Sequence, residues 1–368
     1  MKAWVLKAVG QPEYIEVPAP ELRPGQVLLS VGAAGICGSD IPRIFETGTY
    51  HFPTIPGHEF AGTVVDAYSR EDRRWIGKRA GVFPLIPCGE CFACRDRHYE
   101  MCQSYDYLGS RSDGGFAEFV AVPSWNLIEL PDAVSMEEAA MAEPAAVALH
   151  AVRRLAVQAG DTVALYGLGT IGILITQWLR ICGVRHVFAV GHNPGHGELM
   201  RRTSSEAYEY RNAAGMEDAC DTVAWISAST GGRGADIAID CAGTPETLTN
   251  CINCVRAGGQ VLAVGNPKGE MRLEQAVYWK LLRRQIRLTG TWNSTFDHTP
   301  EDDWHRVMTE IESGNLKPAE LITHRLPPGE LRRGLLIARG REEYHNKIML
   351  IHPDSRYVPD DERMGTGL

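Results

Sequence analysis

The sequence has no apolar run long enough to cross a bilayer, and residues 1–9 lack the apolar core and cleavage pattern of a signal peptide. Clusters of basic residues are also absent, and the formal net charge is -9 at pH 7. These absences argue against a general binder of nucleic acid or of anionic membranes, although they leave room for a local basic pocket that takes a phosphorylated small molecule. We therefore expect a cytoplasmic protein whose partners include neither nucleic acid nor membranes.

Length and composition indicate a globular protein of two domains. Of the 368 residues, 44% are hydrophobic and 23% are charged, which provides apolar material for more than one core. Residues 1 to about 85 contain short β-branched or apolar runs, such as 26–31 and 62–66, separated by turn residues and without an internal repeat. They predict a small, barrel-like antiparallel domain whose loops carry function.

Four of the ten cysteines are closely spaced. Cys88, Cys91, Cys94 and Cys102 follow the pattern C-x2-C-x2-C-x7-C, which suits one tetrahedral Zn²⁺ if the loop folds around it. The alternatives are a redox pair, an iron–sulfur cluster or unrelated buried thiols. Because four thiolates leave no open coordination position, we predict a structural zinc rather than a catalytic one.

A second candidate metal site begins at Cys37 and His58, which offer a soft and a borderline ligand. Two ligands do not close a site. Farther along, Ser135 and Glu138 form a predicted capping box that opens a helix over 136–155, and this helix carries Glu143 among small apolar residues. A buried carboxylate needs a partner. Taken alone, Glu143 is more often an ion-paired or surface residue than a ligand.

The pattern changes at residue 161. A buried strand over 161–166 is followed by a glycine-rich turn and by an apolar helix over 173–182, and the next strand is 186–190. The turn has the sequence Gly167-Leu168-Gly169-Thr170-Ile171-Gly172. Because this G-x-G-x-x-G lies between a strand and a helix start, it predicts that the backbone binds a dinucleotide pyrophosphate at the helix N-terminus.

Further strands at 236–240, 260–264 and 286–289 alternate with helical stretches. This alternation predicts a parallel, doubly wound α/β sheet. Cys251 and Cys254 lie on one of the helical stretches, and we interpret them as packing residues. Beyond about residue 292 the composition is mixed, with a helix near 301–313, a strand at 347–351 and a polar tail from residue 354 that we expect to be poorly ordered.

The tip of the strand 186–190 lacks the Asp or Glu that usually binds the adenosine ribose hydroxyls. Gly191, His192 and Asn193 stand there, and Arg201 and Arg202 follow. Either these residues accept a 2′-phosphate, or the backbone and Asn193 hold the ribose and NAD binds. The sequence leaves both NAD and NADP open.

Together these motifs resemble the zinc-dependent medium-chain alcohol and polyol dehydrogenases, over nearly the whole chain to about residue 352. Within that family the galactitol-1-phosphate 5-dehydrogenase and sorbitol dehydrogenase branch is most similar. The matching segments are Cys37–Asp40, Gly57–Glu59, the four-cysteine lobe, Glu143-Pro144, Gly167–Gly172, and residues 37–45, 105–118 and 289–293.

The resemblance implies an architecture. A GroES-like, β-rich catalytic domain is expected from residues 1–152 and 293–368, with the structural-zinc lobe at 86–104. A Rossmann domain, a doubly wound parallel sheet, is expected over 153–292. The resemblance further implies an active site in the cleft between these domains, with the nicotinamide beside the catalytic zinc, and assembly into a homodimer or homotetramer.

The resemblance also implies roles for single residues. Glu143 takes the third position at the catalytic zinc beside Cys37 and His58, directly or through water, and Glu59 is an alternative ligand or supports the ligands. Zinc acts as a Lewis acid on the substrate oxygen, and hydride passes to the nicotinamide. Ser39 accepts the alcohol proton. Many relatives continue this relay with a His at the position of Pro42, so its continuation here stays open.

The substrate is predicted to be a secondary alcohol on a polyol or polyol phosphate. Arg43 and Arg111 are the two candidates for a forked donor to a phosphate, and the hypothesis is that Arg43 binds it, because Arg43 follows the zinc loop in the segment that is specific to this branch. The alternative is that both are ordinary surface or bracing arginines. Other alcohols, such as an aminocyclitol, L-idonate or L-threonine, are rival substrates. A non-catalytic nucleotide-binding relative is disfavoured because Cys37, Ser39, His58, Glu59 and Glu143 are all present.

Overall fold

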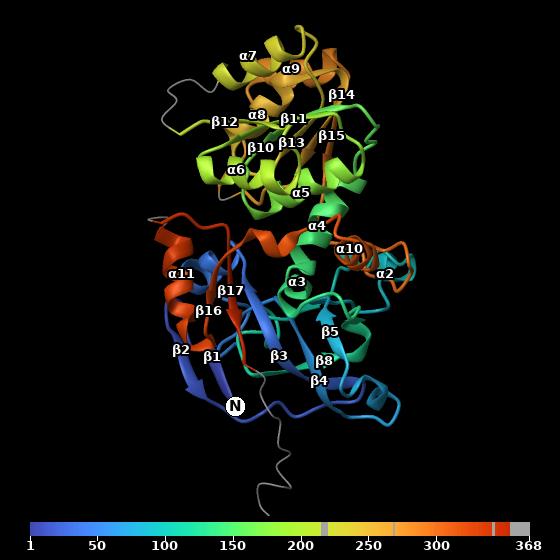
Figure 1. Ribbon diagram of the computed structural model, residues 1–368, viewed down its shortest axis with the longest axis vertical. Coiled ribbons are helices and arrows are strands. Elements are labelled where there is room, and N and C mark those ends of the chain that lie inside the picture. Colours follow the sequence, from blue (N-terminus) through green and yellow to red (C-terminus); the bar gives the residue numbers. More distant parts are fainter. Residues whose placement is uncertain (215–219, 268, 341–342, 354–368) are drawn as a thin grey trace, which may run out of the picture. The chain divides into compact units, whose positions relative to one another are not determined.

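The computed structural model describes residues 1–214, 220–267, 269–340 and 343–353 (Figure 1). The chain forms two compact units. The first comprises Met1–Glu143 together with the described residues from Ile322 on, and the second is Pro144–Leu321. The expected tail from residue 354 lies outside the described residues. No helix in the described ranges is long and apolar enough to span a membrane.

A seven-stranded sheet forms the centre of the first unit. Its strands are β3 (Gln26–Ile36), β4 (Glu59–Ala67), β5 (Arg79–Val82), β8 (Phe119–Pro123), β9 (Leu127–Glu129), β16 (Ile322–Leu326) and β17 (Lys347–Ile351). The order is β16-β17-β3-β4-β5-β9, with β8 also pairing with β3. All pairs are antiparallel except β16 with β17. This agrees with the predicted antiparallel domain built from both ends of the chain.

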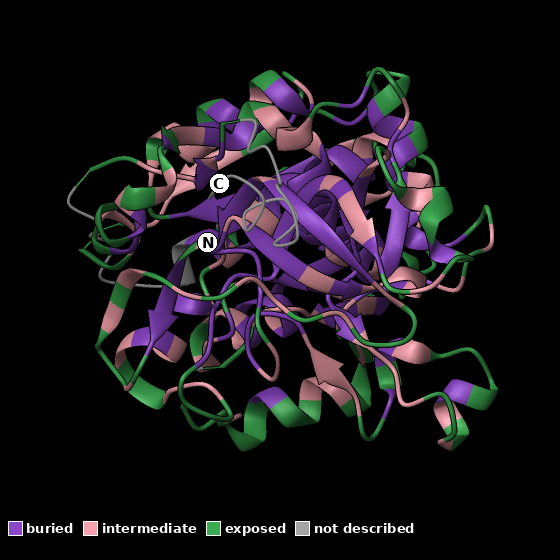
Figure 2. Ribbon diagram, turned by 90° about the horizontal axis from the view of Figure 1, so that it is seen from below, coloured by how far each residue is buried: buried purple, intermediate pink, exposed green. Residues whose placement is uncertain are grey.

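Short elements surround this sheet. They are β1 (Lys2–Leu6), β2 (Pro12–Glu16), α1 (Asp40–Pro42), η1 (Arg43–Thr47), η2 (Asp72–Trp75), β6 (Leu85–Ile86), α2 (Phe92–Arg95), η3 (Tyr99–Met101), β7 (Asp106–Tyr107), η4 (Ser124–Asn126), α3 (Met136–Ala140), η6 (Pro328–Glu330) and α11 (Leu331–Gly340). Figure 2 shows buried residues along the strands and exposed residues on the loops and outer helices. The apolar core therefore lies on the sheet, and the loops at its ends are free to carry polar groups.

The helix predicted over 136–155 is two helices, α3 and α4 (Ala142–Arg153). The predicted capping box is present, because Ser135 accepts from the Glu138 N–H and the Glu138 side chain returns to the Ser135 N–H. The break at Met141 follows from Pro144. Proline has no N–H to donate to the carbonyl four residues earlier, and its ring crowds that carbonyl. The sequence-based prediction of one continuous helix was wrong at this point.

The second unit contains a six-stranded sheet that is parallel throughout. Its strands are β10 (Thr162–Tyr166), β11 (His186–Gly191), β12 (Glu209–Asn212), β13 (Ala235–Asp240), β14 (Val255–Ala263) and β15 (Arg287–Gly290). The order β12-β11-β10-β13-β14-β15 is that of a Rossmann sheet, as predicted.

Helices cover both faces of this sheet. They are α5 (Thr170–Ile181), α6 (Pro194–Thr203), α7 (Cys220–Ser229), α8 (Pro245–Cys254) and α9 (Gln275–Arg283), followed by α10 (Asp303–Glu312) and η5 (Pro318–Leu321). Figure 1 shows α5 and α6 on one side and α7, α8 and α9 on the other. Cys251 and Cys254 are buried in the core beside Tyr166 and Ile226, which agrees with the packing role predicted for them.

The two units divide the chain after Glu143 and after Leu321, whereas the predicted catalytic domain was 1–152 with 293–368 and the predicted Rossmann domain was 153–292. Trp178 of α5 donates its indole N–H to the carbonyl of Ala145 (3.0 Å), and Asp303 of α10 accepts from Arg153 (2.8 Å). Most of α4 and all of α10 therefore belong to the second unit.

Candidate active site

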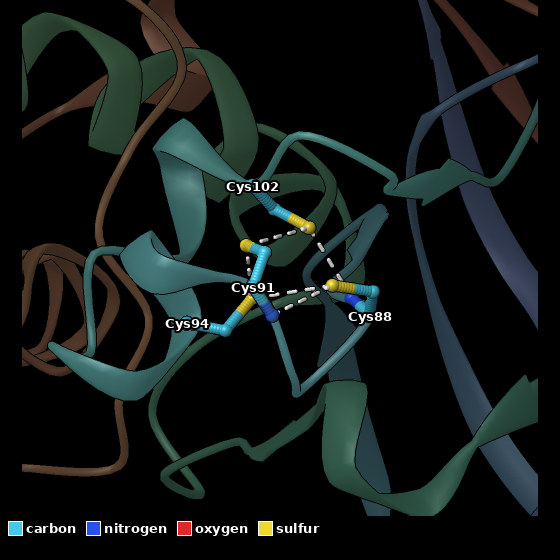
Figure 3. A group of neighbouring side chains, drawn as sticks. All are labelled: Cys88, Cys91, Cys94 and Cys102. Carbon is cyan, nitrogen blue, oxygen red and sulfur yellow. Dashed lines mark hydrogen bonds between the residues drawn. The ribbon is translucent and has the colours of Figure 1, made fainter.

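The four closely spaced cysteines converge in the first unit, as Figure 3 shows. Their Sγ atoms all lie within 4.8 Å of one another. Individual Sγ–Sγ distances are 3.9 Å for Cys88–Cys94, 3.5 Å for Cys91–Cys94 and 3.9 Å for Cys91–Cys102. Four thiolates bound to zinc at about 2.3 Å stand about 3.8 Å apart. The donor set and its spacing thus fit one tetrahedral zinc with no open position.

Backbone N–H groups in this lobe point at the sulfur atoms. The N–H of Cys88 donates to Cys102 Sγ (3.3 Å) and that of Cys91 donates to Cys88 Sγ (3.4 Å). Hydrogen bonds from the backbone, above all from Gln103, lower the pKa of Cys91 to about 6. Such donors stabilise thiolate, which is the form that binds a metal.

A second cluster lies at the end of β3 and β4. Ligand atoms of Cys37, His58 and Glu59 lie within 4.8 Å of one another. The antiparallel register explains this, because Gly35 pairs with Glu59 and so brings Cys37 and His58 to the same end of the two strands. A Cβ at Gly35 would stand 2.4 Å from Glu59 Oε2, so glycine at this position makes room for the carboxylate.

Asp40 orients the imidazole of His58. Its Oδ2 accepts from the Cys37 N–H (2.9 Å), and its Oδ1 lies 3.4 Å from His58 Nδ1. Although burial opposes ionisation, His58, Arg43 and the Cys37 N–H together lower the Asp40 pKa. Burial lowers the His58 pKa, but the charges of Asp40 and Cys37 outweigh it and raise that pKa well above its usual value. With Nδ1 facing a carboxylate, Nε2 is left for a metal.

The Glu59 carboxylate forms a buried ion pair with Lys347 of β17. Lys347 Nζ also donates to the carbonyl of Ile36 (3.2 Å). Burial lowers the Lys347 pKa, but Glu59 outweighs this and the pKa is raised. Nothing in the sequence pattern identified Lys347, since it stands 288 positions from Glu59.

Glu143 is not part of the cluster within 4.8 Å, but it interacts electrostatically with His58, Glu59 and Lys347. Burial raises the pKa of Glu143 to about 7, with Glu59 adding to the rise and His58 and Lys347 opposing it. The hydroxyl of Tyr107 donates to Glu143 Oε1 (3.3 Å). Tyr107 was also missed by the sequence analysis.

Ser39 lies beside the first metal ligand. Its hydroxyl donates to Cys37 Sγ (3.3 Å) and accepts from Arg43 Nη1 (3.2 Å). Arg43 Nη1 is also 4.0 Å from Asp40 Oδ1. Pro42 belongs to α1 and has no group that transfers a proton. The structure thus brings Ser39 and Arg43 together, whereas Arg111 lies between the rings of Tyr50 and Tyr105.

The glycine-rich turn of the second unit joins β10 to α5. Gly167 has φ +96°, which favours glycine, and a Cβ there would stand 2.7 Å from the N atom of Ala242. A Cβ at Gly172 would stand 2.3 Å from the carbonyl oxygen of Gly167. Gly169 is the N-cap of α5, and a Cβ there would meet nothing within 4 Å. Two glycines therefore close the turn and the third leaves space for a pyrophosphate, so the turn fits a dinucleotide.

The predicted ribose-binding residues lie at the end of β11 and directly after it. Gly191 is its last residue, and Asn193 caps α6 by accepting from the N–H of Gly195 (3.0 Å). Tyr210 of β12 lies against this position: a Cβ at Gly191 would be 3.2 Å from Tyr210 Cε2 and 3.2 Å from Leu168 Cβ. The Asn193 side chain thus already has a structural role.

Two family models match the chain. The family described as Alcohol dehydrogenase GroES-like domain matches residues 23–132, and the one described as Zinc-binding dehydrogenase matches residues 170–313. Galactitol 1-phosphate 5-dehydrogenase of Escherichia coli is 30% identical over 326 residues, which cover 88% of this chain and 92% of that protein. Sorbitol dehydrogenase of Bacillus subtilis is 31% identical over 273 residues, covering 73% and 75%.

Solved structures agree with these matches. The crystal structure of galactitol-1-phosphate dehydrogenase from Escherichia coli has a TM-score of 0.86 and 28% identity, and the match covers 95% of this chain and 100% of that one. A zinc-binding dehydrogenase from Sinorhizobium meliloti, bound to NADP, has a TM-score of 0.85 and 29% identity, covering 95% and 98%.

Proposed function

Since the chain belongs to the zinc-dependent medium-chain alcohol and polyol dehydrogenases, we propose that it oxidises a secondary hydroxyl of a polyol to a ketone with NAD or NADP as hydride acceptor. The observation that carries this proposal is the cluster of Cys37, His58 and Glu59 at one strand end, with Ser39 in contact with its thiol. A relative that had lost catalysis would have no reason to keep these groups together.

We assign the catalytic zinc to Cys37 and His58, with Glu59 or Glu143 completing the site. When bound, zinc supplies Lewis-acid polarisation of the substrate hydroxyl, and the nicotinamide accepts hydride. Asp40 faces Nδ1 of His58 and so orients the ring with Nε2 toward the metal position. Lys347 balances the charge of Glu59 in a buried setting.

Ser39 is the group assigned to take the proton from the substrate hydroxyl. Its Oγ accepts from Arg43 and donates to Cys37 Sγ, so its orientation is fixed by two contacts. Arg43 favours a negative charge near Ser39, which assists proton removal. Because Pro42 carries no transferable proton, the relay continues through a group other than a histidine at this position.

For the cofactor, the turn from Gly167 to Gly172 is proposed to hold the pyrophosphate, with Leu168, Thr170 and Ile171 completing the loop. The space at Gly169 supports this assignment. Gly191, His192 and Asn193 are proposed to flank the adenosine ribose. The NADP bound by the Sinorhizobium relative supports NADP as one candidate, and the missing carboxylate at Gly191 is compatible with it.

The test is a panel of polyols, polyol phosphates and amino alcohols assayed with NAD and with NADP, together with metal analysis. Two zinc ions per chain and turnover of at least one secondary alcohol are expected. Loss of turnover after removal of zinc, and its return on addition of zinc, would connect the metal to the reaction. The absence of turnover with every alcohol in a zinc-replete protein would contradict the proposal.

We also propose that the protein is a homo-oligomer and is cytoplasmic. Strand β15 is an edge strand with mostly exposed residues, and large apolar side chains are exposed on it and nearby: Tyr278, Trp279, Leu282, Leu288 and Trp292. An exposed apolar edge of this kind supports pairing with a second copy. None of the nine cysteines whose side chains are described forms a disulfide, which supports a reducing compartment.

A further inference from the structure

We propose that Arg111 binds a terminal oxyanion of the substrate, so that the enzyme acts on polyols that carry a phosphate ester or a carboxylate at one end. The proposal rests on the function proposed above, because it concerns the substrate of the same site. Among the two arginines predicted to bind phosphate, the structure favours Arg111 and gives Arg43 another task.

The guanidinium of Arg111 is held between two aromatic rings. Its central carbon is 4.0 Å from the ring centre of Tyr50 and 4.6 Å from that of Tyr105. These two ring contacts restrain the guanidinium without using its N–H groups as donors to a carboxylate. A planar fork with fixed orientation is the arrangement that suits the oxygen pairs of phosphate and carboxylate.

The charged guanidinium of Arg111 contacts aromatic rings rather than a carboxylate of the described residues. In the described part of the chain, no carboxylate forms an ion pair with it, and its buried Nε has no hydrogen-bond partner. Arg43 differs, because its Nη1 donates to Ser39 and lies 4.0 Å from Asp40. A buried donor without a partner is costly unless a ligand satisfies it. Arg111 is therefore the arginine that gains most from an anion.

The backbone holds this stack in place while one side stays open. His51 Nε2 lies 2.9 Å from the carbonyl oxygen of Arg111, and the N–H of Tyr50 donates to the carbonyl of Ser110 (3.3 Å). These bonds tie the segment that carries Tyr50 to the turn that carries Arg111. Tyr50 itself is 66% exposed, so solvent and ligands reach the edge of the stack.

A continuous row of aromatic contacts connects the stack to the metal cluster. The ring of Tyr105 lies 6.1 Å from that of Tyr107, which in turn lies 5.8 Å from the imidazole of His58. All of these residues belong to the first unit. A substrate with its reacting hydroxyl at the metal and its anion on a terminal carbon is of the kind that engages both ends of this row.

The decisive experiment compares kcat/KM for a hexitol 1-phosphate, the matching aldonate and the neutral hexitol, in the wild type and in Arg111→Gln. Loss of a charge-assisted hydrogen bond should lower kcat/KM for the preferred anion on the order of 10- to 100-fold. The value for the neutral hexitol should change little. The phosphate and aldonate arms show which oxyanion the site takes.

Three further variants make the result specific. Arg111→Lys keeps the charge but loses the fork, and should recover only part of the preference. Tyr50→Ala removes one face of the stack at an exposed position, and should weaken the preference even if Arg111→Gln folds poorly. Arg74→Gln is the matched control, because Arg74 is an exposed arginine of the same unit, on η2, and it should behave as wild type.

The possible failures are distinguishable. If the wild type oxidises the neutral hexitol as well as either anion, or if Arg111→Gln lowers all three substrates equally, the inference is overturned while the proposed dehydrogenase function stands. If no alcohol is oxidised, the proposed function fails. In that case, calorimetric binding of hexitol 1-phosphate tests Arg111 separately. Tight binding to the wild type that is lost in Arg111→Gln supports the site, whereas equal affinity of the two proteins contradicts it.

Discussion

The two units build their proposed sites from different chemistry. The metal cluster of the first unit consists of the side chains of Cys37, His58 and Glu59, and the buried charges of Asp40 and Lys347 lie beside it. The dinucleotide turn of the second unit consists of backbone, and its key residues are glycines whose missing Cβ atoms leave space. The proposed metal site should therefore lose its function when a side-chain ligand atom is removed. The proposed dinucleotide site should lose its function when a Cβ atom is added at a glycine.

The largest effect is expected at the metal cluster. Cys37→Ser removes a ligand of the proposed catalytic zinc, and turnover should fall on the order of 10,000-fold with little change in Tm. Cys94→Ser in the thiol lobe is the matched variant, because it should lower Tm instead. Each variant should keep one zinc per chain. Metal analysis and calorimetry decide, and equal losses of activity in both variants would contradict the division of roles.

The next largest effect is expected for the buried ion pair of Glu59 and Lys347. Lys347→Met leaves the Glu59 charge without its partner, and the free energy of unfolding should fall by about 3–5 kcal/mol. The double variant Glu59→Gln with Lys347→Met removes both charges and should recover part of that loss. Denaturant unfolding measures both. A double variant less stable than Lys347→Met would show that the pair is not what holds these strands together.

The glycine turn allows a test by addition. Gly169→Ala places a methyl group where the structure has free space, so Tm should stay unchanged. The methyl should hinder the approach of the pyrophosphate and raise KM for the cofactor on the order of 100-fold. Gly172→Ala should lower Tm, because its Cβ would stand 2.3 Å from the Gly167 oxygen. Unchanged cofactor affinity in Gly169→Ala would place the pyrophosphate elsewhere.

Two buried histidines in the first unit extend the contrast between paired and unpaired groups. Asp40 keeps the His58 pKa high, whereas burial without a partner for Nε2 lowers the His352 pKa to about 4. Unfolding restores the usual pKa, so the unfolded chain binds a proton more readily. The contribution of His352 to stability is therefore present above pH 6.5 and is lost as the pH falls toward 4.

His352→Gln should remove this dependence. At pH 5 the wild type should have lost about 2 kcal/mol through this residue, and the variant should not show that loss. Denaturant unfolding at pH 5 and pH 7.5 gives the comparison. Identical pH slopes in the two proteins would mean that His352 is solvated in the folded chain.

The smallest effect is expected at Gly191, which is proposed to flank the adenosine ribose of the cofactor. Gly191→Asp should raise the NAD to NADP ratio of kcat/KM roughly 5-fold, because a carboxylate binds the ribose hydroxyls and repels a 2′-phosphate. The structure adds a complication, since a Cβ at this position would meet Leu168 and Tyr210 at 3.2 Å. Gly191→Ala separates that crowding from the charge. An unchanged ratio in Gly191→Asp would show that residue 191 does not contact the ribose.

The sequence predicted what depends on local patterns. Strand and helix alternation gave the Rossmann sheet, and the spacing of Cys88 to Cys102 predicted the thiol cluster. Residues paired through the fold were not found: Asp40 beside His58, Lys347 beside Glu59, and the tyrosines around Arg111. Such contacts depend on strand register and on side-chain direction, which no local spacing contains. The sequence does contain the signal for the break at Met141. Pro144 follows three residues later and cannot donate the helical hydrogen bond to the carbonyl four residues before it.

The position of β17 has a consequence for synthesis of the chain. Residues 348–351 of β17 pair with β3, which starts at Gln26, and Lys347 supplies the charge opposite Glu59. The second unit is continuous from Pro144 to Leu321, so all of its strands leave the ribosome before β17 does. Domains fold as units during translation, in order of emergence. Here β3 is made before the second unit and its partner β17 after it, so the β3 edge that pairs with β17 stays exposed until residue 351 has emerged.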